Sequence, residues 1–170
     1  EAVFMADEYG RYLAPVPLLE VVVAARLLAA FNRDDLLDQL ARGERRIGFM
    51  PMPVESGATA VVPNLCACDA ILALRNGQVA LIPVAAAQAQ TNLGRAPISP
   101  WQIPADGEIL AEGEAAIALF EGAAEEWKLL TASATVGAAQ RSMEIASAYA
   151  NEREAFGRPI GSYQGIAHPL

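Results

Sequence analysis

A stretch near the end of the chain, YANEREAFGRPIGSYQ (149–164), combines side chains that could hold a nucleotide. Arg153 could clamp a diphosphate through two parallel hydrogen bonds, because its planar guanidinium matches the geometry of phosphate oxygens. Phe156 could lie against a purine ring, and the amide of Gln164 could both donate and accept hydrogen bonds. Gly157 and Pro159 interrupt the helical pattern at this point. The spacing therefore predicts a turn that presents a guanidinium, a ring and an amide to an anionic, aromatic ligand.

The same residues also have an ordinary structural explanation, which their spacing leaves open. Basic side chains in a last helical turn, followed directly by a glycine, are a common way for a helix to end. On this alternative interpretation Arg153 and Gly157 terminate a helix and bind nothing. Their residue types alone do not separate the two interpretations.

The wider stretch resembles the start of the C-terminal helical domain of acyl-CoA dehydrogenases. That family has a pattern close to Tyr-Ala-x-x-Arg-x-x-Phe-Gly-x-Pro-Ile with a Gln a few residues on, and this chain has YANEREAFGRPI (149–160) and Gln164. The preceding ASATVGAAQRSMEIASAYA (132–150) is similar to the family's first C-terminal helix. The resemblance implies FAD as the cofactor, with Arg153 on its diphosphate and Phe156 and Gln164 against its adenosine part. In the family these residues reach the flavin of a neighbouring subunit, so the resemblance also implies a homo-oligomer (dimer or tetramer) or a hetero-oligomer with a related chain.

Composition limits the other possibilities. The chain has 170 residues, which suggests one domain or a little more, and its net charge of -8 argues against a nucleic-acid or anionic-membrane surface. The longest apolar run, PLLEVVVAA (17–25), contains Glu20 and is too short to span a bilayer. No signal-peptide pattern opens the sequence. We therefore expect a cytoplasmic protein without a membrane span.

Both ends of the sequence suggest a piece of a longer chain. The first residue is Glu1, and the last residues stop at Leu170 inside an apolar, helix-like pattern. The resemblance agrees with this expectation, because family members have helices before the position of Glu1 and several after that of Leu170. It also implies that the catalytic carboxylate lies beyond Leu170, so no catalytic residue is assigned in this chain.

The first 45 residues predict helices. Apolar residues recur at roughly helical spacing in 1–13, and Pro17 is well placed to start the next helix. The segment 18–31 is apolar on most faces, which predicts a buried helix. Asn32 is expected to cap a third helix that ends near Gly43.

A second resemblance covers this part of the chain. The run EYGRYLAPVPLLE (8–20), followed by LARGERRIGF (40–49), is similar to the last helices of the family's N-terminal domain. The residues at the matching positions are Glu8, Gly10, Arg11, Pro15, Pro17, Gly43 and Glu44. We interpret Arg11 as a solvated charge near a helix end.

From residue 46 to about 120 the pattern changes to short apolar runs separated by Gly, Pro and Asn. Such runs predict strands, here RIGFMPM, TAVVP, AILALR, QVALIPV and AAIALF. Asn76–Gly77 between two of them favours a type I′ hairpin. The expected fold class is α+β and acyl-CoA dehydrogenase-like. It has an N-terminal helical part (1–45), a small β-barrel or sandwich domain (46–120), and the start of a C-terminal helical bundle (121–170).

The β region departs from the family at the flavin ring. Redox-active members carry a loop resembling Thr-Glu-x-x-Ala-Gly-Ser-Asp after the first strand, whereas this chain has GFMPMPVESGATAVVP (48–63). A family Trp-x-Thr or Trp-x-Ser also has no counterpart in AVVPN (60–64). The resemblance therefore supplies contacts for the adenosine end of FAD and none for its isoalloxazine end.

A single long helix is expected from about Glu121 to Arg153. Apolar and small residues cover several of its faces, which predicts burial in a bundle. Gly137 would weaken an isolated helix by roughly 1 kcal/mol relative to Ala, so we expect a neighbour to approach it closely. Lys128 near the helix start is expected to be solvated or paired with Glu125.

Other chemistry finds little support in the sequence. Cys66 and Cys68 form a Cys-x-Cys pair, but with one histidine and no further cysteine they cannot build a four-ligand zinc site in one subunit. We interpret both as small thiols. His168, the single histidine, has no nucleophile signature near it, and no metal site is predicted.

The leading hypothesis is a flavoprotein of the acyl-CoA dehydrogenase family. The resemblance implies FAD-dependent 2,3-dehydrogenation of an acyl-CoA thioester in lipid or fatty acid metabolism, with electrons passed on to an electron-transfer acceptor. The alternative is a catalytically silent partner subunit that completes the flavin site of a sister chain in a mixed oligomer. Missing flavin-ring motifs beside a retained adenosine motif would suit that role.

Overall fold

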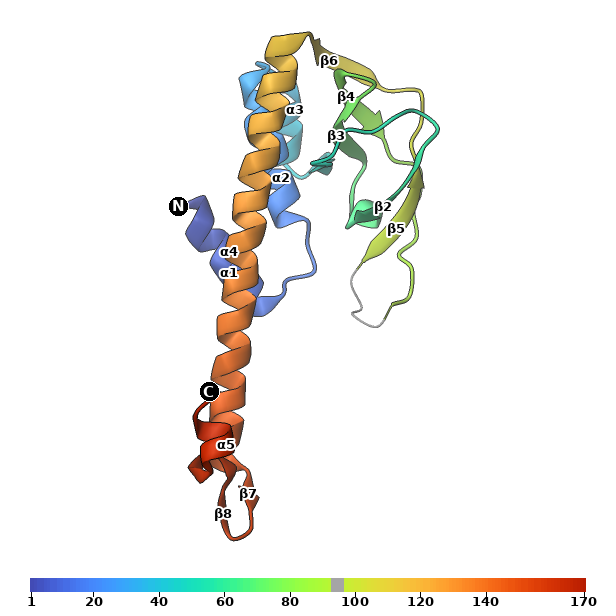
Figure 1. Ribbon diagram of the computed structural model, residues 1–170. Coiled ribbons are helices and arrows are strands. Elements are labelled where there is room, and N and C mark those ends of the chain that lie inside the picture. The colour runs from blue at the N-terminus through green and yellow to red at the C-terminus, as the bar shows by residue number, and fades with distance from the viewer. Residues whose placement is uncertain (93–96) are drawn as a thin grey trace. The chain divides into compact units, whose positions relative to one another are not determined.

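The structure, a computed structural model, describes residues 1–92 and 97–170 (Figure 1). The chain forms two bodies, one made of Glu1–Ala14 with Leu130–Leu170 and the other of Pro15–Leu129. The long helix α4 (Glu114–Glu152) begins in the second body and continues into the first. The two bodies are groups of residues that contact one another, and they need not coincide with domains. The domain boundaries expected from the sequence therefore stay a prediction.

Two helices open the body Pro15–Leu129. The first, α2 (Leu18–Ala30), follows Pro17 as expected and buries its apolar face, and the second is α3 (Asp34–Ala41). Asn32 does not cap α3. It lies just after α2 with φ 55°, and its N–H donates to Ala29 O, so it ends α2. Asn tolerates the left-handed conformation that such helix ends require, which explains why the expected N-cap role is wrong.

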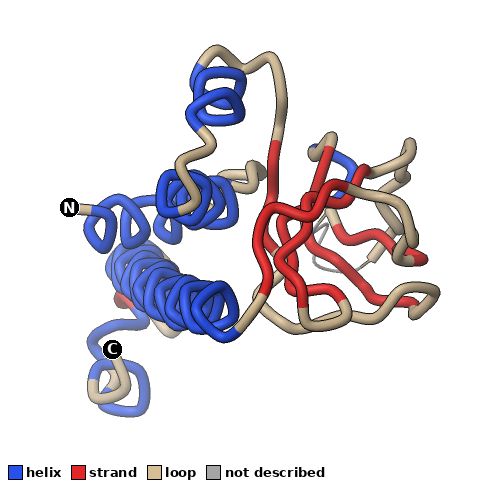
Figure 2. The backbone as a smooth tube through the Cα atoms, turned by 90° about the horizontal axis from the view of Figure 1, so that it is seen from above, coloured by secondary structure: helices blue, strands red, loops and turns tan. Residues whose placement is uncertain are grey.

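Two sheets follow. The four-stranded sheet has the order β1-β3-β4-β6, with β1 parallel to β3 and the other neighbours antiparallel. The two-stranded sheet pairs β2 with β5 antiparallel, and Figure 2 shows these strands gathered in one group. The strands are β1 (Ile47–Phe49), β2 (Thr59–Pro63), β3 (Ala70–Arg75), β4 (Gln78–Pro83), β5 (Ile98–Gln102) and β6 (Glu108–Glu112), with a 3₁₀ turn η1 (Leu65–Ala67) after β2.

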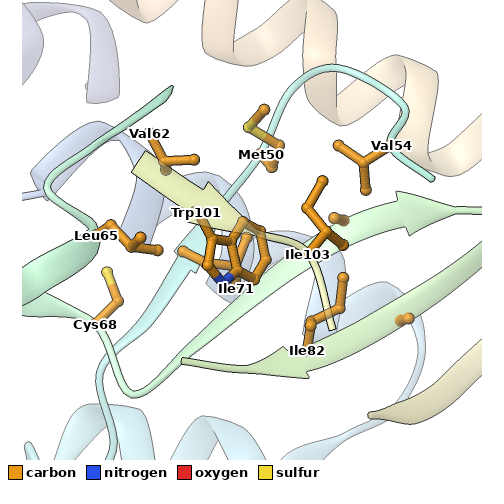
Figure 3. Close-up of a cluster of buried hydrophobic side chains, with 11 residues drawn as sticks. Met50, Val54, Val62, Leu65, Cys68, Ile71, Ile82, Trp101 and Ile103 are labelled. Carbon is orange, nitrogen blue, oxygen red and sulfur yellow. The ribbon is translucent and has the colours of Figure 1, made fainter. Parts of the chain in front are cut away.

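One hydrophobic cluster joins the two sheets. Trp101 of β5, only 6% exposed, points into the cluster together with Ile71 of β3 and Ile82 of β4, as Figure 3 shows. Trp101 is therefore a core residue. Within the described residues the sheets share this core but remain separate, so the region is a sandwich. The expected α+β class is confirmed.

The turn between β3 and β4 has the predicted type I′ form. Asn76 and Gly77 both have positive φ, 50° and 80°, and Arg75 pairs with Gln78 across the turn. The Asn76 side chain also accepts from the Ser56 N–H (3.2 Å) and donates to Ser56 Oγ (3.1 Å). Asn76 is therefore bound on both sides of its amide.

The run AAIALF (115–120) is helical, so the strand expected there is wrong. It forms the start of α4, whose residues Ala116, Phe120 and Ala124 are buried four residues apart. Phe120 packs on Phe49 of β1, with ring centroids 5.3 Å apart. A short apolar run has no clear period of its own, and here the alanines favour the helix.

In the other body, α1 (Ala2–Tyr12) packs directly on α4. A Cβ on Gly137 would lie 2.0 Å from Asp7 O, and one on Gly10 would lie 1.8 Å from Ala134 O. The two backbones are thus in contact, and the close neighbour expected at Gly137 is confirmed.

Arg11 is not a solvated charge, contrary to expectation. Its side chain is 19% exposed, and its Nη2 donates to Glu144 Oε2 at 2.9 Å. Arg141 binds the same carboxylate oxygen at 3.1 Å. These hydrogen bonds, that of Arg11 first, hold the pKa of Glu144 below its usual range. The partner lies far along the chain, so the local pattern could not show it.

None of the helices among the described residues is long and apolar enough to cross a membrane.

Candidate nucleotide site at the end of α4

The predicted end of the helix and turn of the chain are present. Helix α4 ends at Glu152, and a small hairpin follows, made of β7 (Glu154–Ala155) and β8 (Arg158–Pro159) (Figure 1). Ala155 pairs with Arg158, so only Phe156 and Gly157 form the turn. Their φ values of 54° and 80° make it a type I′ turn like the one at Asn76–Gly77.

Phe156 occupies an unfavourable backbone position. Type I′ turns favour Asn, Asp or Gly at this place, and a left-handed conformation costs other residues roughly 1–2 kcal/mol. Its side chain is 97% exposed, so burial within this chain does not offset that cost. Strained residues of this kind cluster at functional sites. The geometry is that of a ring held outward for something else to contact.

The hairpin is fixed to the end of the helix by backbone hydrogen bonds. The N–H of Arg153 donates to Tyr149 O, and the N–H of Ile160 donates to Arg153 O, both at 2.8 Å. The chain then continues through the 3₁₀ turn η2 (Ile160–Ser162), where Gly161 lies close to Ala150 O of α4. The position of Arg153 relative to α4 is therefore set by the backbone.

The guanidinium of Arg153 has no hydrogen-bond or ion-pair partner within the described part of the chain, and it is exposed. Gln164 is also exposed and is the first residue of α5 (Gln164–Ala167). The structure thus places Arg153, Phe156 and Gln164 on one short segment, each open to solvent. That they bind FAD stays a prediction.

Tyr163 joins the parts of this segment. Its hydroxyl donates to Ala155 O at 2.9 Å, and its ring meets the ring of Phe156 edge-on, with centroids 6.4 Å apart. The guanidinium of Arg158 lies over the same ring, 4.1 Å from its centre. An apolar cavity of about 200 Å³ lies beside these rings, and Ala155, Phe156, Ile160, Tyr163 and Ile166 line it.

The loop after β1 differs from this hairpin in its chemistry. Its backbone is used internally: the Val54 N–H donates to Leu74 O (2.8 Å) and the Gly57 N–H to Ile103 O (2.9 Å). A largely apolar groove of about 380 Å³ lies along it, lined by Met50, Met52, Pro53, Val54, Glu55, Ala58, Thr59, Ala60 and Ile103. This loop offers an apolar surface and few free donors.

Comparison with known proteins places these features in a family. The family model described as "Acyl-CoA dehydrogenase, C-terminal domain" matches residues 117–170, which include the hairpin and most of α4. The acyl-CoA dehydrogenase IpdE2 of Mycolicibacterium smegmatis is 28% identical over the whole of this chain. Along its whole length the chain is similar to an acyl-CoA dehydrogenase, and its residues 117–170 match the C-terminal domain of that family. It spans 50% of the length of IpdE2.

Solved structures of acyl-CoA dehydrogenase type share the fold. The ChsE4–ChsE5 complex from Mycobacterium tuberculosis matches with a TM-score of 0.76 at 22% identity, over 98% of this chain and 54% of that one. A glutaryl-CoA dehydrogenase from Mycobacterium smegmatis in complex with FADH2 matches with a TM-score of 0.54 at 19% identity, over 85% of this chain and 48% of the other. At these identities the likeness concerns the fold alone.

The sequence places Arg158 beside the other residues of the turn without a role of its own, and it does not single out Tyr163. Both stand inside the quoted motif, but the family pattern leaves their positions unspecified. Their contacts depend on how the turn closes, since Tyr163 reaches back to Ala155. An aromatic residue on each side of a Gly-x-Pro turn is the signal that could have suggested the pair.

Two further groups of the body Pro15–Leu129 have structural explanations. Lys128 pairs with Glu125 at 2.6 Å, as expected, at the rim of a cavity of about 570 Å³. Cys68 is buried, and burial raises the pKa of its thiol to about 11, whereas Cys66 is exposed. Among the described residues no three His, Cys, Asp or Glu side chains come together as metal ligands.

Proposed function

We propose that this chain is an acyl-CoA dehydrogenase subunit whose hairpin holds the diphosphate-adenosine end of an FAD shared with a neighbouring subunit. The observation that carries the proposal is the outward presentation of Phe156 in a strained turn, on the same segment as an unpaired Arg153. Within this chain the ring of Phe156 gains one edge-on contact, with Tyr163. A bound adenine and diphosphate would use both groups.

The residues present fit the adenosine half of the cofactor. Arg153 would neutralise and orient the diphosphate, because a guanidinium can donate two parallel hydrogen bonds to phosphate oxygens. Phe156 would stack on the adenine, and Gln164 would satisfy the polar edge of the ring or the ribose. FAD, when bound, would supply the hydride acceptor for conversion of an acyl-CoA thioester to its 2,3-enoyl form.

The whole protein provides the test. After purification we expect a flavin absorbance spectrum, with FAD released on denaturation and identified by chromatography. With acyl-CoA thioesters of several chain types, an artificial electron acceptor should be reduced in step with enoyl-CoA formation. A colourless protein that takes up no added FAD would contradict the proposal.

A second candidate is a partner subunit that is silent on its own. The loop after β1 favours it, because the stretch 48–63 has no flavin-ring motif and its N–H groups at Val54 and Gly57 are already bonded within the chain. The structural neighbour ChsE4–ChsE5 is itself a complex of two proteins. On this interpretation the hairpin completes a flavin site whose ring end belongs to the other chain.

Co-expression separates the two candidates. A tagged form of this protein should retain a related acyl-CoA dehydrogenase chain through purification if it is a partner subunit, and flavin should be present only in the mixed oligomer. Dehydrogenation by the isolated protein, without a second chain, would exclude the silent role.

A further inference from the structure

We propose that Tyr163 is the positioning residue of this site: it holds the turn Phe156–Gly157 in its left-handed form, so that Phe156 is preset for the adenine. The inference deepens the proposed function and rests on it for the identity of the ligand. The part of the inference that concerns the support of the turn involves contacts within this chain only.

The first step concerns what keeps the turn in place. With φ 54°, Phe156 lies in a conformation that is disfavoured for residues with a large side chain. The strands on either side have two residues each, which is too little to enforce the turn by themselves. Such strain persists only where the surroundings fix it. Further contacts must therefore supply the support.

The second step identifies those contacts. Tyr163 binds the residue before the turn, through its hydroxyl to Ala155 O (2.9 Å), and touches the turn residue itself, through an edge-on ring contact with Phe156. Tyr163 also contacts the residue after the turn, because the guanidinium of Arg158 lies 4.1 Å from the centre of its ring. Among the described residues, one side chain thus engages Ala155, Phe156 and Arg158 at once.

The third step separates the two arginines of the segment. Arg158 is placed over the face of Tyr163, which is the geometry of a cation–π contact. Arg153 has no such partner among the described residues and is free to meet a phosphate. Arg158 accordingly acts through Tyr163 on the turn, and Arg153 acts on the ligand.

The experiment compares three variants of the whole protein. Tyr163→Phe removes only the hydroxyl and keeps the ring volume, whereas Tyr163→Leu also removes the ring. Tyr12→Phe is the matched control, because Tyr12 ends α1 with an exposed side chain outside this segment. Binding of FAD and of FMN, which lacks the adenosine, is measured on the flavin-free protein by flavin fluorescence. Hydrogen exchange of the peptide covering 154–163 reports the turn itself.

We expect Tyr163→Phe to weaken FAD binding by about 3- to 10-fold, the usual effect of one lost hydrogen bond. Tyr163→Leu should weaken it further and speed exchange at the Ile160 amide, which closes the hairpin onto Arg153 O. FMN binding should stay unchanged in both, since a loss of the adenosine contacts does not affect it. Tyr12→Phe should match the unaltered protein.

Each contrary result has a distinct meaning. If Tyr163→Phe and Tyr163→Leu bind FAD as the unaltered protein does, the positioning role is wrong while the proposed function stands. If FAD and FMN weaken together, Tyr163 is merely structural, and the inference is overturned. If the unaltered protein binds no FAD, the proposed function fails, and unchanged exchange in Tyr163→Leu would then remove the support role as well. Should Tyr163→Leu not fold, Tyr163→Phe decides.

Discussion

Within the described residues the same two-residue turn occurs twice, with different residues at its first position. Between β3 and β4 that position holds Asn76, and between β7 and β8 it holds Phe156, with a glycine following in each case. Asn76 is bound by Ser56 on both sides of its amide, whereas Phe156 is 97% exposed. One turn uses a residue that suits the backbone, and the other keeps one that does not.

Under the proposed function, this difference separates a turn that stabilises the fold from a turn that binds a ligand. Asn lowers the free energy of the β3–β4 hairpin because it accepts the left-handed conformation and bonds a neighbouring loop. Phe raises the free energy of the β7–β8 hairpin and gains only an edge-on contact with Tyr163. A conformational cost without a matching gain inside the chain indicates that the gain lies outside it.

The largest effect is expected from removing the free guanidinium beside the second turn. Arg153→Ala should weaken FAD binding by about 10- to 100-fold, because hydrogen bonds to charged groups are worth roughly 1.5–3 kcal/mol. Fluorescence titration of the flavin-free protein measures it. Arg42→Ala removes an exposed arginine elsewhere and serves as the control. Equal affinity in Arg153→Ala and the unaltered protein would show that the second turn does not face a diphosphate.

The next largest effect is expected when Asn76 of the β3–β4 turn is replaced by phenylalanine, the residue of the β7–β8 turn. Asn76→Phe should lower the free energy of unfolding by about 2 kcal/mol, the sum of left-handed strain and the lost bonds to Ser56. Urea unfolding followed by the fluorescence of the two tryptophans, Trp101 and Trp127, measures it. FAD binding by the folded variant should stay the same. A variant as stable as the unaltered protein would mean that the two turns do not differ in strain.

The reverse exchange, Phe156→Asn, should have a smaller effect on stability, and it should change stability and FAD binding in opposite directions. Phe156→Asn should raise the free energy of unfolding by about 1 kcal/mol, since Asn adopts the left-handed conformation more readily. The same change should weaken FAD binding, because the stacking ring is gone. Both quantities can be measured on one preparation. If stability and FAD binding fall together, Phe156 belongs to the fold and the comparison of the two turns fails.

The sequence predicts those elements whose signals are local. Asn76–Gly77, the end of α4 near Arg153 and the close approach at Gly137 follow from residue types within a few positions. Elements set by distant partners do not follow in the same way. Strand β5 contains Pro100 and is defined by its pairing with β2, and Arg11 is held by Glu144.

The residues of the candidate site also differ in whether local sequence or contacts in the fold reveal them. The motif predicts Arg153, Phe156 and Gln164 as site residues, and the structure places them on one exposed segment. Tyr163 could not be chosen, because its role depends on the hydrogen bond to Ala155 that forms once the hairpin closes. The residues that position the site through contacts within the chain can therefore be recognised only in the folded structure.

The smallest effect concerns pH, and it too separates the two turns. In the body that contains Asn76, Arg33 lowers the pKa of Asp35 to about 2, and Arg46 holds the pKa of Asp69 below its usual range. A carboxyl group whose pKa is lower in the folded state stabilises that state above its unfolded pKa, and the contribution disappears as the pH falls toward the folded value. Stability of the body Pro15–Leu129 should therefore be constant near neutral pH and fall between about pH 4 and pH 2.

Both pairs are exposed to solvent, so the fall should be modest. Urea unfolding at stepped pH, followed by tryptophan fluorescence, measures it. Asp35→Asn should make the fall shallower by removing one of the two carboxyl groups. At the second turn no carboxylate among the described residues pairs with Arg153, so exchange of the peptide 154–163, corrected for the intrinsic pH dependence of exchange, should hardly respond over this range. A fall of equal size in Asp35→Asn would assign the acid sensitivity to other groups.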